Sequence, residues 1–160
     1  MERVNRILSH DLFKCYVSEN AKEEKYRQFC RHDLGHALDV ARIAWILNLE
    51  EEAGLSKDLV YGAALLHDIG RYLQYREGTP HEQASATLAE DILDECGFTE
   101  SESKVILHAI VSHRDAKMAK KKDLAGVIYR ADKMSRPCFG CKMEKECNWK
   151  QDKKNMVITL

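Results

Sequence analysis

Four polar residues occupy positions where a helix is expected to bury aliphatic side chains. They are His36, the adjacent pair His67 and Asp68, and Asp132, each flanked by apolar residues at helical spacing. A buried aspartate costs free energy unless it is paired, hydrogen-bonded or bound to a metal. A single histidine on an apolar face is more often a satisfied core residue. Together, however, the four residues predict a metal site, because divalent first-row transition metals accept both imidazole nitrogens and carboxylate oxygens.

The elements that must position these residues are predicted to be helices. Apolar residues recur at helical spacing, no segment shows sustained period-two alternation, and the chain has only two prolines. An all-α fold is therefore expected. Helices are predicted over about residues 4–16, 28–48, 59–69, 81–96, 100–113 and 124–135. Residues 71–80 are expected to form a polar connection, and residues 114–123 a basic loop.

Several helix boundaries carry recognisable signals. Ser56 is a predicted N-cap, Gly70 marks the end of the most apolar helix, and Thr99 with Glu102 has the spacing of a capping box. At 160 residues the chain suits one domain. We expect a helical bundle over residues 1–136 and a polar, cysteine-bearing tail over residues 137–160.

Composition and charge exclude several classes of protein. Hydrophobic residues make up 44% and charged residues 32% of the chain, which argues against disorder. The formal net charge of −1 provides no general attraction to nucleic acid or to an anionic membrane. The charged N-terminus lacks a secretory signal, and no run approaches the roughly 18 apolar residues of a membrane span. A cytoplasmic location is expected, where the six cysteines would remain reduced.

Three local sequences carry a family resemblance. They are HALDVARIA at residues 36–44, ALLHDIGR at residues 64–71 and YRADK at residues 129–133. In this order they resemble the motifs of the HD superfamily of metal-dependent phosphohydrolases, and the resemblance covers about residues 29–136. It implies a single helical HD-domain bundle with a metal site at the motif residues.

The resemblance also implies the composition of that metal site. Two-metal members of the superfamily carry further histidines in positions equivalent to His81 and His113. One or two divalent ions are therefore expected, and histidine ligands suit Fe, Mn, Co, Ni or Zn better than Mg. Asp68, the expected catalytic residue, would bridge two ions. The other expected ligands are His36, His67 and Asp132 for one ion, and His81 and His113 for the other.

Three histidines fall outside this set. His108 is five residues from His113, about 140° around a helix, so the two cannot share one face, and His108 is the alternative ligand. His32 is expected to lie behind a ligand or to face the substrate rather than to bind metal. His10 is expected to be a surface residue of the first helix.

Basic residues next to the expected ligands could bind a phosphorylated substrate. Phosphate esters need positive charge beyond the metals, and Arg71, Arg114 and Lys133 each adjoin an expected ligand. The lysines at 120–122 are more simply a solvated part of the loop. This basic loop has no interleaved aromatic residues, which argues against nucleic acid as the partner.

The cysteines of the tail suggest a second metal site. Cys138 and Cys141 form a C-x₂-C step and Cys147 follows, which is the spacing of a knuckle that binds structural zinc or iron. Cys30 is the candidate fourth ligand if the tail folds back. A redox-active pair and simple packing are the alternatives. Cys15 and Cys96 are expected in the core.

The resemblance implies hydrolysis of a phosphate ester or anhydride by metal-activated water. A nucleotide is the expected substrate class, and the ligand set and short chain look most like the HD enzymes that split symmetric dinucleoside polyphosphates. Two alternatives remain: an HD-type di-iron oxygenase that cleaves C–C or C–P bonds with O₂, and a non-catalytic nucleotide-binding regulator. Whether the chain forms a homo-oligomer is left open.

Overall fold

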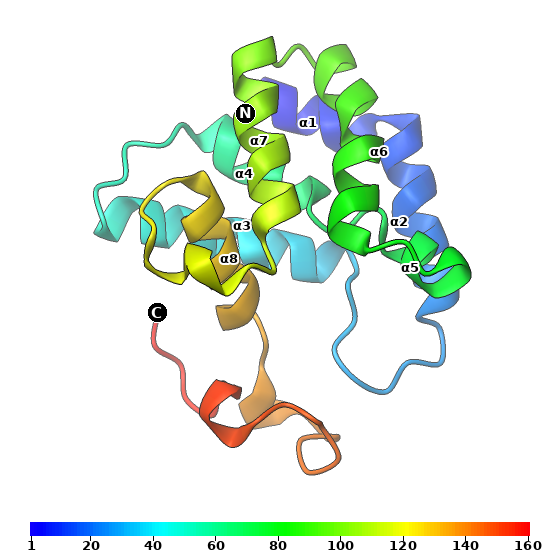
Figure 1. Ribbon diagram of the computed structural model, residues 1–160, viewed down its shortest axis with the longest axis vertical. Helices are drawn as coiled ribbons and strands as arrows, with labels where there is room; N and C mark the ends of the chain where they lie inside the picture. The colour runs from blue at the N-terminus through cyan, green and yellow to red at the C-terminus, as the bar shows by residue number, and fades with distance from the viewer.

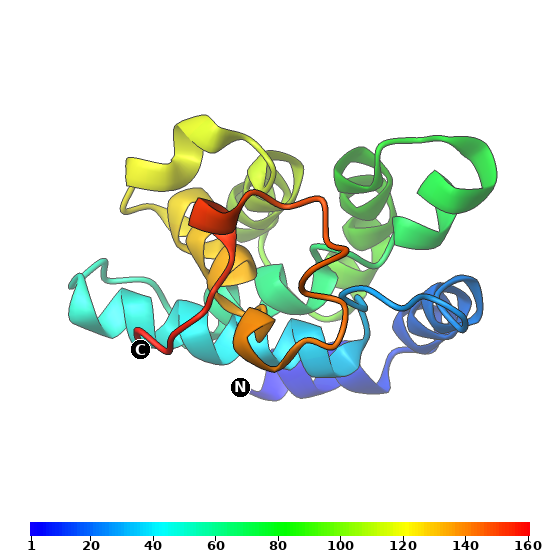
Figure 2. The same ribbon diagram turned by 90° about the horizontal axis from the view of Figure 1, so that it is seen from below.

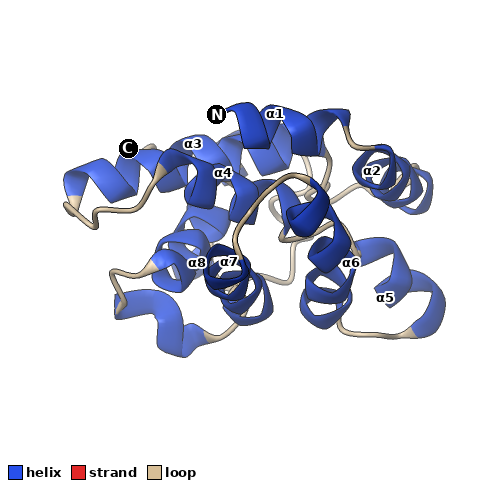
Figure 3. Ribbon diagram, turned by 90° about the horizontal axis from the view of Figure 1, so that it is seen from above, coloured by secondary structure: helices blue, strands red, loops and turns tan.

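The computed structural model describes residues 1–160 and confirms the all-α fold (Figure 3). The chain forms α-helices and short 3₁₀ helices with no strand. No helix combines the length and the apolar character needed to cross a bilayer. The α-helices are α1 (Glu2–Ser9), α2 (Asp11–Glu23), α3 (Leu34–Glu50), α4 (Lys57–Leu66), α5 (Arg71–Glu77), α6 (His81–Glu95), α7 (Glu100–Ser112) and α8 (Leu124–Met134). The 3₁₀ helices are η1 (Ala116–Lys120), η2 (Cys138–Gly140) and η3 (Gln151–Lys153).

Helix α4 lies at the centre of the bundle. It packs most extensively against α3, also against α7, α1 and α8, and more lightly against α6, while α2 and α5 pair at one side (Figure 1). Its residues Val60, Ala63, Ala64 and Leu66 have no exposed surface. This burial on several sides explains why the segment is apolar all round.

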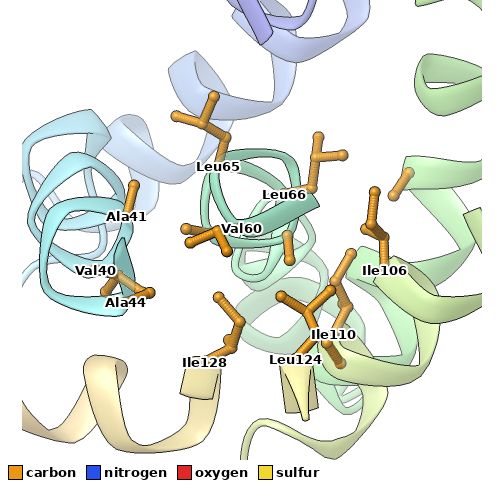
Figure 4. Packing of buried hydrophobic residues seen from close by; sticks show 14 of the residues in the cluster. Val40, Ala41, Ala44, Val60, Leu65, Leu66, Ile106, Ile110, Leu124 and Ile128 are labelled. Carbon is orange, nitrogen blue, oxygen red and sulfur yellow. The ribbon is translucent and has the colours of Figure 1, made fainter. Parts of the chain in front are cut away.

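The core fills the space between four helices. Figure 4 shows side chains of α3, α4, α7 and α8 gathered between these helices, including Val40, Val60, Ile110 and Ile128. Burial of this apolar surface is the main favourable contribution to folding. The packed core also holds in place the helix ends that carry the polar residues described below.

The predicted caps are confirmed. The Ser56 hydroxyl accepts from the Leu59 N–H, and Thr99 and Glu102 form a complete capping box at the start of α7. Gly70, in contrast, does not end the apolar helix as expected, because α4 already ends at Leu66 and Gly70 is the N-cap of α5.

The predicted first helix is wrong in one respect, because it is broken at His10. There the backbone turns to an extended conformation, and the His10 ring accepts a hydrogen bond from the Leu12 N–H. The same ring lies 3.1 Å from a carboxylate oxygen of Glu95. His10 is therefore the N-cap of α2 and a contact to α6 rather than a free surface residue.

Three further segments differ from the prediction. The second predicted helix begins only at Leu34, because Asp33 caps its first turn by accepting from the His36 N–H. His32 therefore precedes the helix. The expected connection at residues 71–80 contains α5, and the basic loop contains η1.

Of the two cysteines assigned to the core, Cys96 is buried but Cys15 is exposed.

The tail at residues 137–160 forms only the 3₁₀ turns η2 and η3. Seen from below in Figure 2, it runs in orange and red across the face of the bundle, near the loop that joins α2 to α3. The ends of several helices meet at this face.

Candidate metal centre

The six residues expected to bind metal lie together in the structure. They form two groups whose ligand atoms all lie within 4.8 Å of one another: His36, His67 and Asp132 in one group, and Asp68, His81 and His113 in the other. All are buried except His36, which is partly exposed.

Asp68 lies between the two groups. Its Oδ2 is 3.2 Å from Nε2 of His67 and 3.7 Å from Nε2 of His36. Its Oδ1 is 3.2 Å from Nε2 of His81 and 3.7 Å from Nε2 of His113. The two carboxylate oxygens therefore face different pairs of histidines, as a carboxylate that bridges two ions would.

Helix ends position all of these side chains. His36 lies in the first turn of α3 and Asp132 in the last turn of α8. His81 is the first residue of α6, while His67 and His113 directly follow α4 and α7. Backbone groups at helix ends lack partners within the helix, so they are free to form hydrogen bonds with side chains that lie there.

The histidine rings are held by their Nδ1 atoms. Nδ1 of His67 is 2.7 Å from the carbonyl of Ala64, and Nδ1 of His113 is 2.6 Å from that of Ile110. Nδ1 of His36 is 3.3 Å from the Ser135 hydroxyl, and that of His81 contacts the Gln74 amide oxygen. This is the pattern of metal-binding histidines, whose second nitrogen is fixed by hydrogen bonding while the first faces the ion.

Three buried atoms at the centre have no hydrogen-bond partner. They are Nε2 of His36, Nε2 of His67 and Oδ1 of Asp68. Leaving buried polar atoms without partners costs free energy, and a bound cation would supply the missing interaction. The donor set and these orphaned atoms fit one or two divalent metal ions.

The charges at the centre shift the pKa values of its residues. Burial raises the pKa of Asp68, but the facing His67 outweighs it and holds that pKa well below the usual range. Burial also raises the pKa of Asp132, but the facing His36 and the adjacent Lys133 outweigh it and hold this pKa well below the usual range. Burial lowers the pKa of His113 to about 4, so this ring is neutral near pH 7. Ionised carboxylates and a neutral imidazole are the forms that bind metal.

His32 lies beside the centre in a different network. Its backbone N–H and its Nδ1 both lie 2.7 Å from the buried carboxylate of Glu24, which also accepts from the Tyr75 hydroxyl at 2.7 Å. Burial lowers the pKa of His32. His32 belongs to neither ligand group, in line with the expected non-ligand role.

Sequence reasoning missed two buried polar residues at the C-terminal end of α2, Asn20 within the helix and Glu24 at its C-cap. Glu24 orients His32, and the Asn20 amide donates to the Asp68 carbonyl at 2.9 Å while accepting from the Tyr72 N–H at 2.7 Å. Asn20 thereby fixes the turn that presents Asp68. Their spacing of four residues on one helix face was the only available signal, and it does not distinguish them from exposed polar residues.

A cleft with a volume of about 690 Å³ opens above the centre. Arg71, Arg114 and Lys133 all line it, as expected of residues that meet a phosphorylated substrate. Arg71 lies 3.2 Å from His81 and is mostly buried, whereas Arg114 is half-exposed and donates to Glu82 at 3.2 Å. Lys133 contacts Asp132 directly.

The alternative ligand His108 is exposed on α7 and belongs to neither ligand group. Its ring lies within 3.5 Å of the Ser112 hydroxyl on the outer side of the helix. His113, in contrast, is buried beside Asp68.

The cysteines of the tail are less closely arranged than the histidines. Cys30, Cys138, Cys141 and Cys147 are all partly buried, and none belongs to a group of ligand atoms within 4.8 Å of one another. Burial raises the pKa of the Cys30 thiol, and the nearby Cys138 and Cys141 raise it further. Cys30 and Cys147 line the same cleft, so this part of the tail lies near Cys30, and the four-cysteine site stays a prediction.

Comparison with known proteins identifies the family. The sequence profile described as "HD domain" matches residues 33–136, and the chain belongs to this family of metal-dependent phosphohydrolases. An uncharacterised protein of Clostridium beijerinckii is 47% identical over 99% of both chains.

More distant relatives are named Ribonuclease Y. The protein of that name from Oleidesulfovibrio alaskensis is 32% identical over 75% of this chain, and Ribonuclease Y 1 of Pediococcus pentosaceus is 33% identical over 57%. The match covers 21% and 16% of these two relatives, so the chain spans about a fifth of their length or less. No solved structure matches the chain.

Proposed function

We propose that this protein hydrolyses phosphate esters or anhydrides of small nucleotides, with Asp68 as the shared ligand of two divalent ions. The observation that carries the proposal is the Asp68 carboxylate, whose two oxygens face two pairs of Nε2 atoms at the floor of a cleft lined by basic residues. Bound divalent ions would supply a Lewis acid that activates water and neutralises phosphoryl charge.

The chain's own residues would orient the substrate. Arg71 and Lys133 approach the centre from different helices, and guanidinium and ammonium groups bind phosphoryl oxygens strongly when water is excluded. Asp68 raises the pKa of Arg71 although burial lowers it, so the side chain stays charged. Arg114 lies at the more exposed part of the cleft, where it would meet a more distant phosphate.

His32 would hold a proton-accepting nitrogen beside the substrate. Its Nδ1 is engaged by Glu24, so the neutral ring carries its proton there and leaves Nε2 as an acceptor. His32 lines the cleft together with Asp68 and His81. This role gives the unexpected Glu24 a function, which is to fix the tautomer and the direction of the ring.

The size of the cleft supports a small substrate. A volume of about 690 Å³ lies within the usual range of sites for small molecules. Nucleoside polyphosphates and symmetric dinucleoside polyphosphates are the compounds that we expect to be cleaved. The relatives named Ribonuclease Y make an RNA oligonucleotide the necessary comparison substrate.

Metal-dependent hydrolysis tests the proposal. The protein, stripped with a chelator and reloaded separately with Fe, Mn, Co, Ni or Zn, should hydrolyse bis-p-nitrophenyl phosphate and a nucleotide with at least one of these metals. Chelation should abolish both reactions. Phosphate release and metal content would be measured on anaerobically purified protein.

The other outcomes separate the alternatives. Absence of turnover with every metal would overturn the proposal in favour of a nucleotide-binding regulator. Consumption of O₂ with cleavage of a C–C or C–P bond would identify a di-iron oxygenase. Cleavage of the RNA oligonucleotide in preference to every small nucleotide would contradict the proposed substrate class.

A further inference from the structure

The C-terminal tail forms one wall of the cleft above the metal centre. The cleft is lined on its inner side by Asp68, His81, His113 and Asp132. On its outer side it is lined by Glu146, Cys147, Asn148, Trp149 and Lys153 of the tail. A substrate that reaches the centre would therefore contact the tail as well (Figure 2).

The tail is attached to the helix that carries Asp132. The Asn155 side-chain amide donates to the carbonyls of Lys133, Met134 and Arg136 at 2.7, 3.1 and 3.0 Å, at the C-terminal end of α8. The Asn155 carbonyl accepts from the Phe139 N–H at 3.0 Å, which closes the tail on itself. These bonds use helix-end carbonyls that have no partner within the helix, and they fix the position of the tail relative to the centre.

Within this wall, Arg136 and Trp149 form a stacked pair. The guanidinium carbon of Arg136 lies 3.8 Å from the centroid of the Trp149 ring, and its Nη2 lies 3.7 Å from Oδ2 of Asp132. Trp149 is only partly buried and lines the cleft. Stacking on Arg136 fixes the orientation of the Trp149 ring before a ligand binds, so less side-chain entropy is lost on binding. The part of the ring that Arg136 does not cover remains accessible from the cleft.

Arg136 has an unused donor. Its Nη1 is buried and has no hydrogen-bond partner, although Arg136 lines the cleft. A buried guanidinium donor without an acceptor is costly, and phosphate oxygens are acceptors that match its geometry. Arg136 thus places a positive charge on the wall of the cleft, where an anionic group of a substrate would lie.

The charges and rings around the cleft agree with an anion that carries an aromatic group. Lysine and arginine outnumber carboxylates among the lining residues, and two of the three carboxylates, Asp68 and Asp132, are proposed metal ligands. Phe29, Tyr129 and Trp149 also line the cleft. Phosphates are recognised by the cations and flat heteroaromatic rings by the aromatic side chains, and a nucleotide combines the two.

We infer that the tail is the base-binding wall of the site, where Trp149, held by Arg136, stacks on the base of a nucleotide whose phosphates reach the His/Asp centre. This inference rests on the proposed function and adds the residue that selects for a base. It also explains why the tail is docked at the cleft rather than elsewhere on the bundle.

The test compares substrates with and without a base. ATP and tripolyphosphate would be the probes, and Trp149→Ala the variant, with Trp45→Phe on α3 as the matched control outside the cleft. Trp149→Ala should raise KM for ATP about tenfold and change kcat less than threefold, since stacking contributes to binding rather than to chemistry. The KM for tripolyphosphate should stay within about twofold, and Trp149→Phe should restore most of the binding of ATP.

Binding measured without turnover gives a second readout. In Trp45→Phe protein, a non-hydrolysable ATP analogue should quench the fluorescence of Trp149, the remaining tryptophan, and calorimetry should show about tenfold weaker binding to Trp149→Ala. Unchanged ATP binding, or an equal loss for tripolyphosphate, would overturn the inference. If no phosphate compound is hydrolysed at all, the proposed function fails, while the calorimetric comparison still decides whether Trp149 binds a base.

Discussion

The His/Asp centre and the tail face each other across one cleft, but they are held in place by different means. The centre is built from the ends of helices α3, α4, α6, α7 and α8, whose apolar faces are packed in the core. The tail has no buried apolar core of its own. It depends on the Asn155 amide, on the contact of Lys154 with Glu144 and on the stacked pair of Arg136 and Trp149.

This difference indicates a division of labour. A metal site requires ligands held within fractions of an ångström, and rigid packed helices provide that precision. Recognition of a substrate tolerates and often requires adaptable segments on a rigid scaffold. We therefore expect changes at the centre to abolish chemistry or destabilise the fold, and changes in the tail to alter selectivity.

The largest effect is expected from Asp68→Ala. Because its two oxygens face both pairs of histidines, the substitution should remove bound metal and lower hydrolysis by about 1000-fold or more. Metal analysis and a phosphodiester assay would measure this. A variant that keeps both its metal and its activity would refute the assignment of the centre, and circular dichroism would show whether the fold is retained.

A pair of glycine substitutions compares the rigidity of the two regions. A Cβ at Gly70 would lie 2.5 Å from the Ser85 nitrogen and 2.7 Å from the Ala84 carbonyl carbon, so Gly70→Ala should cost about 2–3 kcal/mol of unfolding free energy. Gly140 in the tail has no atom within 4 Å of such a Cβ. Gly140→Ala should change stability by less than about 0.5 kcal/mol in urea unfolding. Equal losses of unfolding free energy in the two variants would contradict the expected difference in rigidity between the metal centre and the tail.

The buried carboxylate of Glu24, which lies behind His32, is expected to make the stability of the bundle depend on pH in the acid range. Burial raises the pKa of Glu24, but hydrogen bonds from His32 and Tyr75 outweigh it and lower this pKa from 4.5 to about 2. The folded state therefore favours the ionised carboxylate. The contribution of this ionised carboxylate to the free energy of unfolding is complete above about pH 4.5 and is lost as the pH falls toward 2.

Glu24→Gln tests this dependence. The variant should be less stable than the parent by about 2 kcal/mol at pH 7, because a buried hydrogen-bonded charge is removed. The difference should shrink as the pH falls below 4.5, as measured by urea unfolding at several pH values. A difference that is constant from pH 7 to pH 3 would show that the charge of Glu24 does not contribute.

The smallest effect on chemistry is expected from the cysteines. We propose that Cys30, Cys138, Cys141 and Cys147 together bind a structural zinc or iron ion that stiffens the tail. Cys141→Ser should then lower total metal by about one equivalent and leave the His/Asp centre filled. The control is Cys15→Ser, at an exposed position away from the tail. If Cys141→Ser leaves the metal content unchanged, the proposed cysteine site is refuted.

Much of the centre could be anticipated because its signals are local. His67 and Asp68 follow an apolar run, and a buried charge is informative wherever a helix is expected. The capping box of Thr99 and Glu102 is equally local. The helix break at His10 was missed because the apolar spacing continues through it, so periodicity alone did not reveal the turn.

Long-range polar contacts were beyond the reach of sequence reasoning. Asn20 and Glu24 read as ordinary polar residues of an amphipathic helix, and only the packing of α2 against α5 buries them beside Asp68 and His32. Cys15 fits a helix face and is therefore expected in the core, but α2 buries Phe13 and Asn20 and leaves Cys15 exposed.

The sequence by itself determined the helical fold class, the family motifs and the residues from which a metal centre can be built. Each of these depends on residue type and on spacing within one helix or turn. The tertiary structure decided which carboxylate oxygen faces which histidine, which polar residues of α2 support the centre, and that the tail lies over the cleft. Those relations join residues distant in the chain, and only the packing of the helices brings them together.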